Sequence, residues 1–121
     1  MELSLGSKIA GGITVLEVRG EADVYSSPTL RDRLMDLLDT GSPDAVAPVV
    51  VVDLSEVGFI DSTGLGTLVA AHKRAADQNG ALPVVCAQDR ILKLLRITGL
   101  DDVFEIHATL DEALASARRA R

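Results

Sequence analysis

Hydrophobic and polar residues follow several different periods along this chain of 121 residues. A run of four valines opens the segment Val49–Leu54, whose sequence VVVVDL contains a single polar residue. A short run that is apolar on both faces is typical of a central β-strand covered by helices. Two further short apolar segments, Leu82–Ala87 and Val103–Ile106, predict strands that follow it.

The N-terminal residues predict an antiparallel hairpin. Leu3, Leu5 and Ile9 share one alternating set of positions, and a Gly-Gly pair then supplies a two-residue turn. The next segment, Ile13–Arg19, has the β-branched content of a strand. We expect the chain to leave the sheet at Gly20–Asp23.

Four segments repeat apolar residues at helical spacing. The first is predicted to begin at Ser27, because Pro28 suits the first position of a helix. The others are a helix from about Thr63 to Asn79 with Gly80 as its stop, a short helix capped by Asp89 and ended by Gly99, and a last helix whose Thr109 and Glu112 have capping-box spacing.

The order of these elements defines the expected fold class. A hairpin is followed by alternating helices and strands and by a terminal helix, which indicates an α/β domain whose sheet is parallel where helices cross over. We expect a single domain over residues 1–121, with a mixed sheet of four to five strands and about four helices.

Composition excludes several classes of function. The net charge of −6 argues against nucleic acid as a partner. No apolar run approaches the roughly 20 residues that span a bilayer, and the first residues lack a signal-peptide pattern. The single cysteine, Cys86, lies in an apolar segment and is interpreted as a buried strand residue. We therefore expect a cytoplasmic protein that binds neither membrane nor nucleic acid.

The junction DSTGLG, Asp61–Gly66, lies directly between the valine-rich strand and the second helix. In one interpretation Asp61 or Ser62 caps the helix, and the two glycines allow close packing. However, each glycine lowers helix propensity by about 1 kcal/mol, which is most easily understood where another backbone or a ligand comes close. An approachable helix start with a serine hydroxyl is also suited to docking and to phosphorylation.

Other chemistries fit the sequence poorly. A hydrolase nucleophile elbow needs G-x-S-x-G, but Ile60 stands at the first glycine position. The glycines of the junction are not followed by the lysine of a phosphate-binding P-loop. Two histidines and one cysteine, widely spaced, give no metal-ligand pattern. We therefore expect no enzyme, cofactor or metal site, and we interpret His72, on the apolar side of its helix, as structural.

Asp53 stands at the end of a valine-rich strand, as does the phospho-acceptor of response-regulator receivers. The acidic pair and the strand-end lysine that a receiver also needs are missing here. We expect Asp53 to accept backbone N–H groups in a turn around Glu56–Gly58.

Two blocks carry a resemblance to a known family. VVVDLSEVGFIDSTGLGTLV resembles the signature around the phosphorylated serine of the STAS-domain anti-sigma factor antagonists. GEADVYSSPTLRDRL is similar to the second recognisable block of that family, in which a Gly-Glu-x-Asp turn leads into the first helix. The resemblance covers essentially the whole chain.

This resemblance implies a regulatory cycle. The unphosphorylated protein would bind an anti-sigma factor and free a sigma factor. The anti-sigma factor, a serine kinase with a GHKL-type ATP site, would phosphorylate the antagonist and end the association, and a PP2C-type phosphatase would reset it. By position, Ser62 matches the acceptor serine. The implied partner-binding residues are Asp23, Asp61, Ser62, Thr63, Gly64, Leu65 and Gly66.

Several expectations follow for the structure. Ser62 should be exposed at the helix start, and Asp23 should lie on the same edge of the domain as Asp61–Gly66. Leucine at position 64 or 66 should weaken partner binding without harming the fold. Ser62→Ala should cost at most a helix cap, about 1 kcal/mol. The alternative is a STAS domain that meets no kinase and serves as a scaffold, a ligand-binding module or a transporter subunit.

Overall fold

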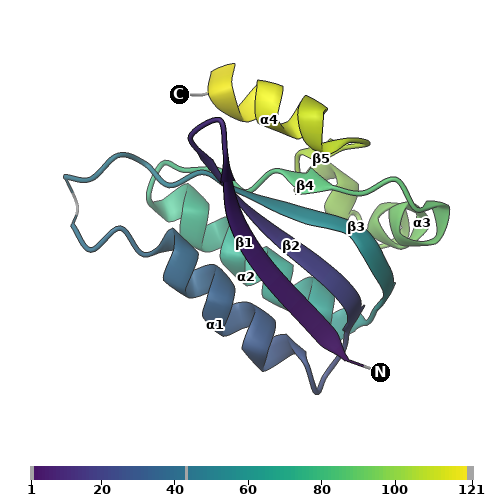
Figure 1. The fold of residues 1–121 in the computed structure, drawn as a ribbon. Coiled ribbons are helices and arrows are strands. Elements are labelled where there is room, and N and C mark those ends of the chain that lie inside the picture. Colours follow the sequence, from purple (N-terminus) through teal and green to yellow (C-terminus); the bar gives the residue numbers. More distant parts are fainter. Residues whose placement is uncertain (1, 43, 120–121) are drawn as a thin grey trace.

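The computed structural model describes residues 2–42 and 44–119, which form a five-stranded mixed sheet with four α-helices (Figure 1). The sheet order is β1-β2-β3-β4-β5, and only the β1–β2 pair is antiparallel. The elements are β1 Leu3–Ala10, β2 Ile13–Ala22, α1 Ser27–Leu38, β3 Val50–Ile60, α2 Ser62–Asp77, β4 Val84–Val85, α3 Asp89–Ile97, a 3-10 turn Leu100–Asp102, β5 Ile106–His107 and α4 Leu110–Arg119. The predicted α/β class is confirmed.

The sheet separates two hydrophobic layers. Helices α1 and α2 cover one face, and α4 covers part of the opposite face (Figure 1). Alternation along β2 explains the division, because Leu16 and Val18 belong to the α1–α2 layer whereas Ile13 and Val15 belong to the α4 layer. The four-valine run is buried on both faces, as the sequence predicts.

Strands β2 and β3 are longer than the sequence indicates. The chain leaves the sheet only at Asp23, the last residue of the expected exit Gly20–Asp23, because β2 continues to Ala22. The expected turn at Glu56–Gly58 is wrong, because β3 continues to Ile60. The parallel pairing of these strands contains two register shifts. At such irregularities the sequence loses its strand-like alternation, and the continuing strand resembles a turn. The last residue pair between the two strands is Ala22 with Ile60, so β2 and β3 end side by side at the same end of the sheet.

Asp53 acts locally within this irregular strand. Its carboxylate accepts the backbone N–H of Ser55 at 2.9 Å. The expected bond to a backbone N–H group is therefore confirmed, although the segment is a strand and not a turn.

Strands β4 and β5 are shorter than predicted. Val84 and Val85 alone form β4, although Leu82 and Cys86 beside them are also buried. Strand β5 is Ile106–His107, so the predicted strand at Val103–Ile106 is wrong at its start. Apolar runs mark burial, but pairing depends on where the neighbouring strand lies.

Two helix ends differ from the sequence-based expectation. After α2, Asn79 and not Gly80 adopts the left-handed conformation that commonly ends a helix, with φ 59°. Gly80 has a different role, because a Cβ at this position would lie 2.0 Å from the carbonyl oxygen of Pro48. Helix α1 begins at Ser27, as predicted, whereas Gln88 precedes α3 in place of Asp89. The predicted Thr109 cap is confirmed, since its hydroxyl accepts the N–H of Glu112 at 3.2 Å.

Candidate functional site

The junction between β3 and α2 is organised by Asp61. This residue is the N-cap of α2, and its Oδ1 atom accepts the backbone N–H of Gly64 at 2.9 Å. The bond satisfies one of the N–H groups that a helix start leaves without a partner. Of the two caps that the sequence allows, the structure therefore selects Asp61 over Ser62.

The second carboxylate oxygen of Asp61 reaches another part of the chain. Its Oδ2 atom accepts the backbone N–H of Val24 at 3.0 Å, while the Asp61 N–H donates to the carbonyl of Ala22 at 3.1 Å. These bonds join the β3–α2 junction to the β2–α1 turn. The expectation that Asp23 shares an edge with Asp61–Gly66 is confirmed.

Asp23 holds the β2–α1 turn together. Its Oδ1 atom accepts the backbone N–H groups of Tyr25 and Ser26, each at 2.9 Å. These donors, the N–H of Ser26 foremost, lower the pKa of the Asp23 carboxyl below its usual value. The turn presents Tyr25, which is 89% exposed and which the sequence analysis did not single out. An isolated tyrosine in a turn block gives no periodic signal that would identify it.

Ser62 and Thr63 form the exposed first turn of α2. The expected exposure of Ser62 is confirmed. Among the described residues, neither hydroxyl makes a hydrogen bond, so the Ser62 Oγ atom is available to a second molecule. The partial positive charge of a helix N-terminus also favours an added anion at this place.

The two glycines of the junction differ in their surroundings. A Cβ at position 64 would lie 2.5 Å from the Ala22 carbonyl oxygen and 2.8 Å from a side-chain carbon of Ile60. A Cβ at position 66 would meet nothing within 4 Å. The expectation that leucine at position 64 leaves the fold intact is therefore wrong, whereas position 66 is open to a partner.

The seven residues expected to bind a partner consequently fall into two groups. Gly64 and Leu65 are buried beneath the junction. Ser62, Thr63 and Gly66 are exposed above it, while the carboxylates of Asp23 and Asp61 are partly buried and engaged in the bonds described above. Which of the seven contact a partner remains a prediction.

Asp61→Ala is expected to destabilise the domain by about 1–2 kcal/mol, because it removes the cap of α2 and leaves the Val24 N–H without its acceptor. Chemical denaturation would measure the change. Thr63→Ala is the matched control, because Thr63 lies two residues after Asp61 and its hydroxyl makes no hydrogen bond within the described part of the chain that the substitution could remove. Equal stability of Asp61→Ala and native protein would contradict this account of the junction.

A polar cluster of Glu105, His107 and Ser116 lies at β5 and α4, and its described contacts are not those of a catalytic set. His107 Nε2 and Ser116 Oγ both contact the same oxygen of Glu105, at 2.6 and 2.9 Å. Burial raises the pKa of Glu105, but these contacts outweigh it and lower the pKa overall. Serine and histidine thus face a shared carboxylate and not each other. His72 contacts Phe104 edge-on at 5.7 Å between ring centroids, which agrees with a structural histidine.

Within residues 2–42 and 44–119, no group of three or more His, Cys, Asp or Glu side chains is placed to hold a metal ion. No helix in the same part of the chain is long and apolar enough to cross a membrane.

Fold and site together define a small α/β domain with an exposed serine at a helix start. Residues 5–113 match the family model of the STAS domain. An anti-sigma-B factor antagonist of Bacillus subtilis (strain 168) is 37% identical over 93 residues, or 77% of this chain and 80% of the relative. The chain belongs to the STAS-domain anti-sigma factor antagonist family, whose members are regulators and not enzymes.

Two further relatives extend the similarity. An anti-sigma-B factor antagonist of Staphylococcus aureus (strain NCTC 8325 / PS 47) is 32% identical over 107 residues, which cover 88% of this chain and 94% of the relative. The crystal structure of an anti-sigma factor antagonist from Mycobacterium paratuberculosis has a TM-score of 0.84 at 29% identity, covering 97% of this chain and 95% of the other.

Proposed function

We propose that this protein is an anti-sigma factor antagonist controlled by phosphorylation of Ser62. In its unphosphorylated form it binds an anti-sigma factor that is also a serine kinase with a GHKL-type ATP site, and a sigma factor is released. Transfer of phosphate to Ser62 ends the association, and a PP2C-type phosphatase restores the binding form. The names of the relatives from Bacillus subtilis and Staphylococcus aureus support the first part of this cycle.

The observation that carries the proposal is the exposed Ser62 hydroxyl at the start of α2. The hydrogen bonds of Asp61 tie the start of α2 to the β2–α1 turn, and so hold the backbone that carries the serine. A kinase can approach the hydroxyl without local unfolding. The neighbouring open position at Gly66 leaves room for the surface of a partner.

Electrostatics explains how one phosphate would switch binding off. A phosphate adds roughly −1.5 to −2 charges and three acceptor oxygens. The helix N-terminus stabilises part of that charge, but Asp61 lies beside it and the chain already carries a net charge of −6. A bulky anion within a contact surface weakens association directly, so no large rearrangement of the domain is required.

The test is to incubate the protein with ATP and each GHKL-type anti-sigma factor of its host, and to follow the intact mass. We expect one phosphoryl group, localised by tandem mass spectrometry to Ser62. Ser62→Ala should accept none, while Thr63→Ala should be modified at its neighbour. Phosphate on Thr63 would contradict the assignment. Stable binding without phosphate transfer would instead favour a STAS scaffold that meets no kinase.

A further inference from the structure

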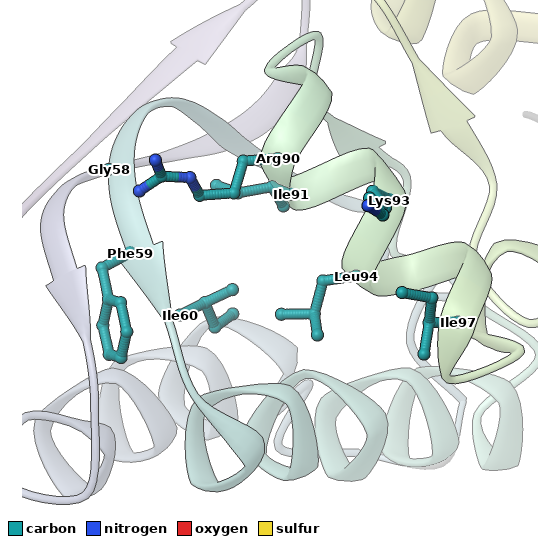
Figure 2. Close-up of a pocket in the computed structure, with 8 residues that line it drawn as sticks. All are labelled: Gly58, Phe59, Ile60, Arg90, Ile91, Lys93, Leu94 and Ile97. Carbon is teal, nitrogen blue, oxygen red and sulfur yellow. The ribbon is translucent and has the colours of Figure 1, made fainter.

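An apolar groove of about 270 Å³ lies between the end of β3 and helix α3 (Figure 2). Its apolar lining comes from two residues of β3 and three of α3, namely Phe59, Ile60, Ile91, Leu94 and Ile97. In Figure 2 the side chains of Ile60 and Leu94 point toward each other across the groove. Phe59 is 45% exposed and Ile97 is 71% exposed, so large apolar side chains remain at the surface.

The groove exists because β3 extends beyond its neighbour. Strand β4 pairs with β3 at Val52 and Asp53, whereas β3 continues to Ile60. Helix α3 lies beside this extension in place of a strand. A helix and a strand edge make no ladder of hydrogen bonds, so only side chains occupy the space between these two elements.

Gln88, directly before α3, fixes this arrangement. Its Nε2 atom lies 2.6, 3.0 and 2.9 Å from the carbonyl oxygens of Leu54, Ser55 and Val57, so its two N–H groups serve three acceptors and one of them is shared. Three contacts from one side chain anchor the start of α3 to the irregular part of β3. The groove is therefore pre-formed, and an occupant need not order its walls.

The charges of the groove indicate what it accepts. Arg90 and Lys93 of α3 line it, and no acidic residue does, although the whole chain carries a net charge of −6. Within the described residues neither cation forms an ion pair. An occupant that is apolar at its centre and carries carboxylates at its edge would complement both the lining and the cations.

The groove also lies next to the proposed phosphorylation site along the chain. Phe59 and Ile60 line it, and Asp61 and Ser62 follow them immediately in the chain. Two residues span at most about 7 Å, so a molecule that covers Ser62 lies close to the groove lining at Ile60. We propose that the groove is the second half of the anti-sigma docking surface and receives a segment of the anti-sigma factor that carries an apolar side chain flanked by carboxylates. This inference rests on the proposed function.

Ile97→Glu tests the apolar part of the groove. The side chain is 71% exposed, so the charge does not enter the core, and circular dichroism should show an unchanged fold. In calorimetric titration with the anti-sigma factor that binds native protein, we expect at least tenfold weaker binding. Val46→Glu is the matched control, because Val46 is 74% exposed in the loop before β3, at the opposite end of that strand, and should leave affinity unchanged.

Charge reversal tests the contribution of the two cations that line the groove, Arg90 and Lys93. Arg90→Glu with Lys93→Glu should lower affinity at least tenfold and should remove much of its decline with added salt. The exposed pair Arg31→Glu with Arg74→Glu, on α1 and α2, makes the same change in net charge and should have a smaller effect.

The outcomes separate the two proposals. Binding that Ser62→Glu abolishes, but that Ile97→Glu and the α3 double reversal leave unchanged, would overturn the groove assignment alone. If no host anti-sigma factor binds native protein, the proposed function fails and the groove assignment fails with it.

Discussion

Ser62→Glu is expected to reduce affinity for the anti-sigma factor by more than about a hundredfold, because it places a charge where a partner must exclude water. A desolvated carboxylate without a counter-ion costs about 3 kcal/mol or more. The Asp61 carboxylate beside it accepts N–H groups and offers no compensating positive charge. The N-terminus of α2 offsets only part of the cost, about 0.3–1 kcal/mol at an exposed site.

Ser62→Ala is the matched control for this prediction. It keeps a small side chain at the contact and should bind the anti-sigma factor as native protein does. Its stability should stay within about 0.5 kcal/mol of native, below the upper limit of one helix cap that the sequence set, because Asp61 caps the helix. In the cell the variant should give sigma activity that the kinase cannot silence. Tight binding by fully phosphorylated native protein, measured by calorimetry, would refute the switch.

Gly64→Leu should destabilise the fold strongly. Its Cβ alone would lie 2.5 Å from the backbone oxygen of Ala22, which is held in the β2–β3 ladder and cannot move aside as a flexible side chain would. We expect a loss of about 3 kcal/mol, or roughly 10 °C in the thermal midpoint. Denaturant unfolding and a thermal melt would measure it.

Gly66→Leu separates packing from docking. The position is exposed and open, so the variant should be as stable as native or gain up to about 1 kcal/mol from better helix propensity. Its added side chain should nevertheless weaken binding of the anti-sigma factor by about tenfold, read by calorimetry. Unchanged affinity would place position 66 outside the contact.

For Gly64→Leu, a melting midpoint equal to that of native protein would contradict the prediction, because it would show that the backbone of the junction can move away from the added side chain.

Local signals in the sequence determined the elements that present the site. The valine run predicts a doubly buried strand, and Asp61-Ser62 before an amphipathic segment predicts a helix start with an exposed hydroxyl. Both predictions rest on patterns of residue types a few positions apart. The same holds for Thr109 as a cap, since the donor it satisfies lies three residues away.

Tertiary structure decided what these elements are joined to. The length of β3 depends on irregular pairing with β2, the role of Gly64 depends on Ala22, and the groove depends on the bonds from Gln88 to β3. Asp61 shows the division within one residue, because its bond to Gly64 is local and its bond to Val24 spans 37 positions. A one-dimensional pattern records burial and local hydrogen bonding, whereas contacts between distant segments are fixed only when the sheet brings their backbones together.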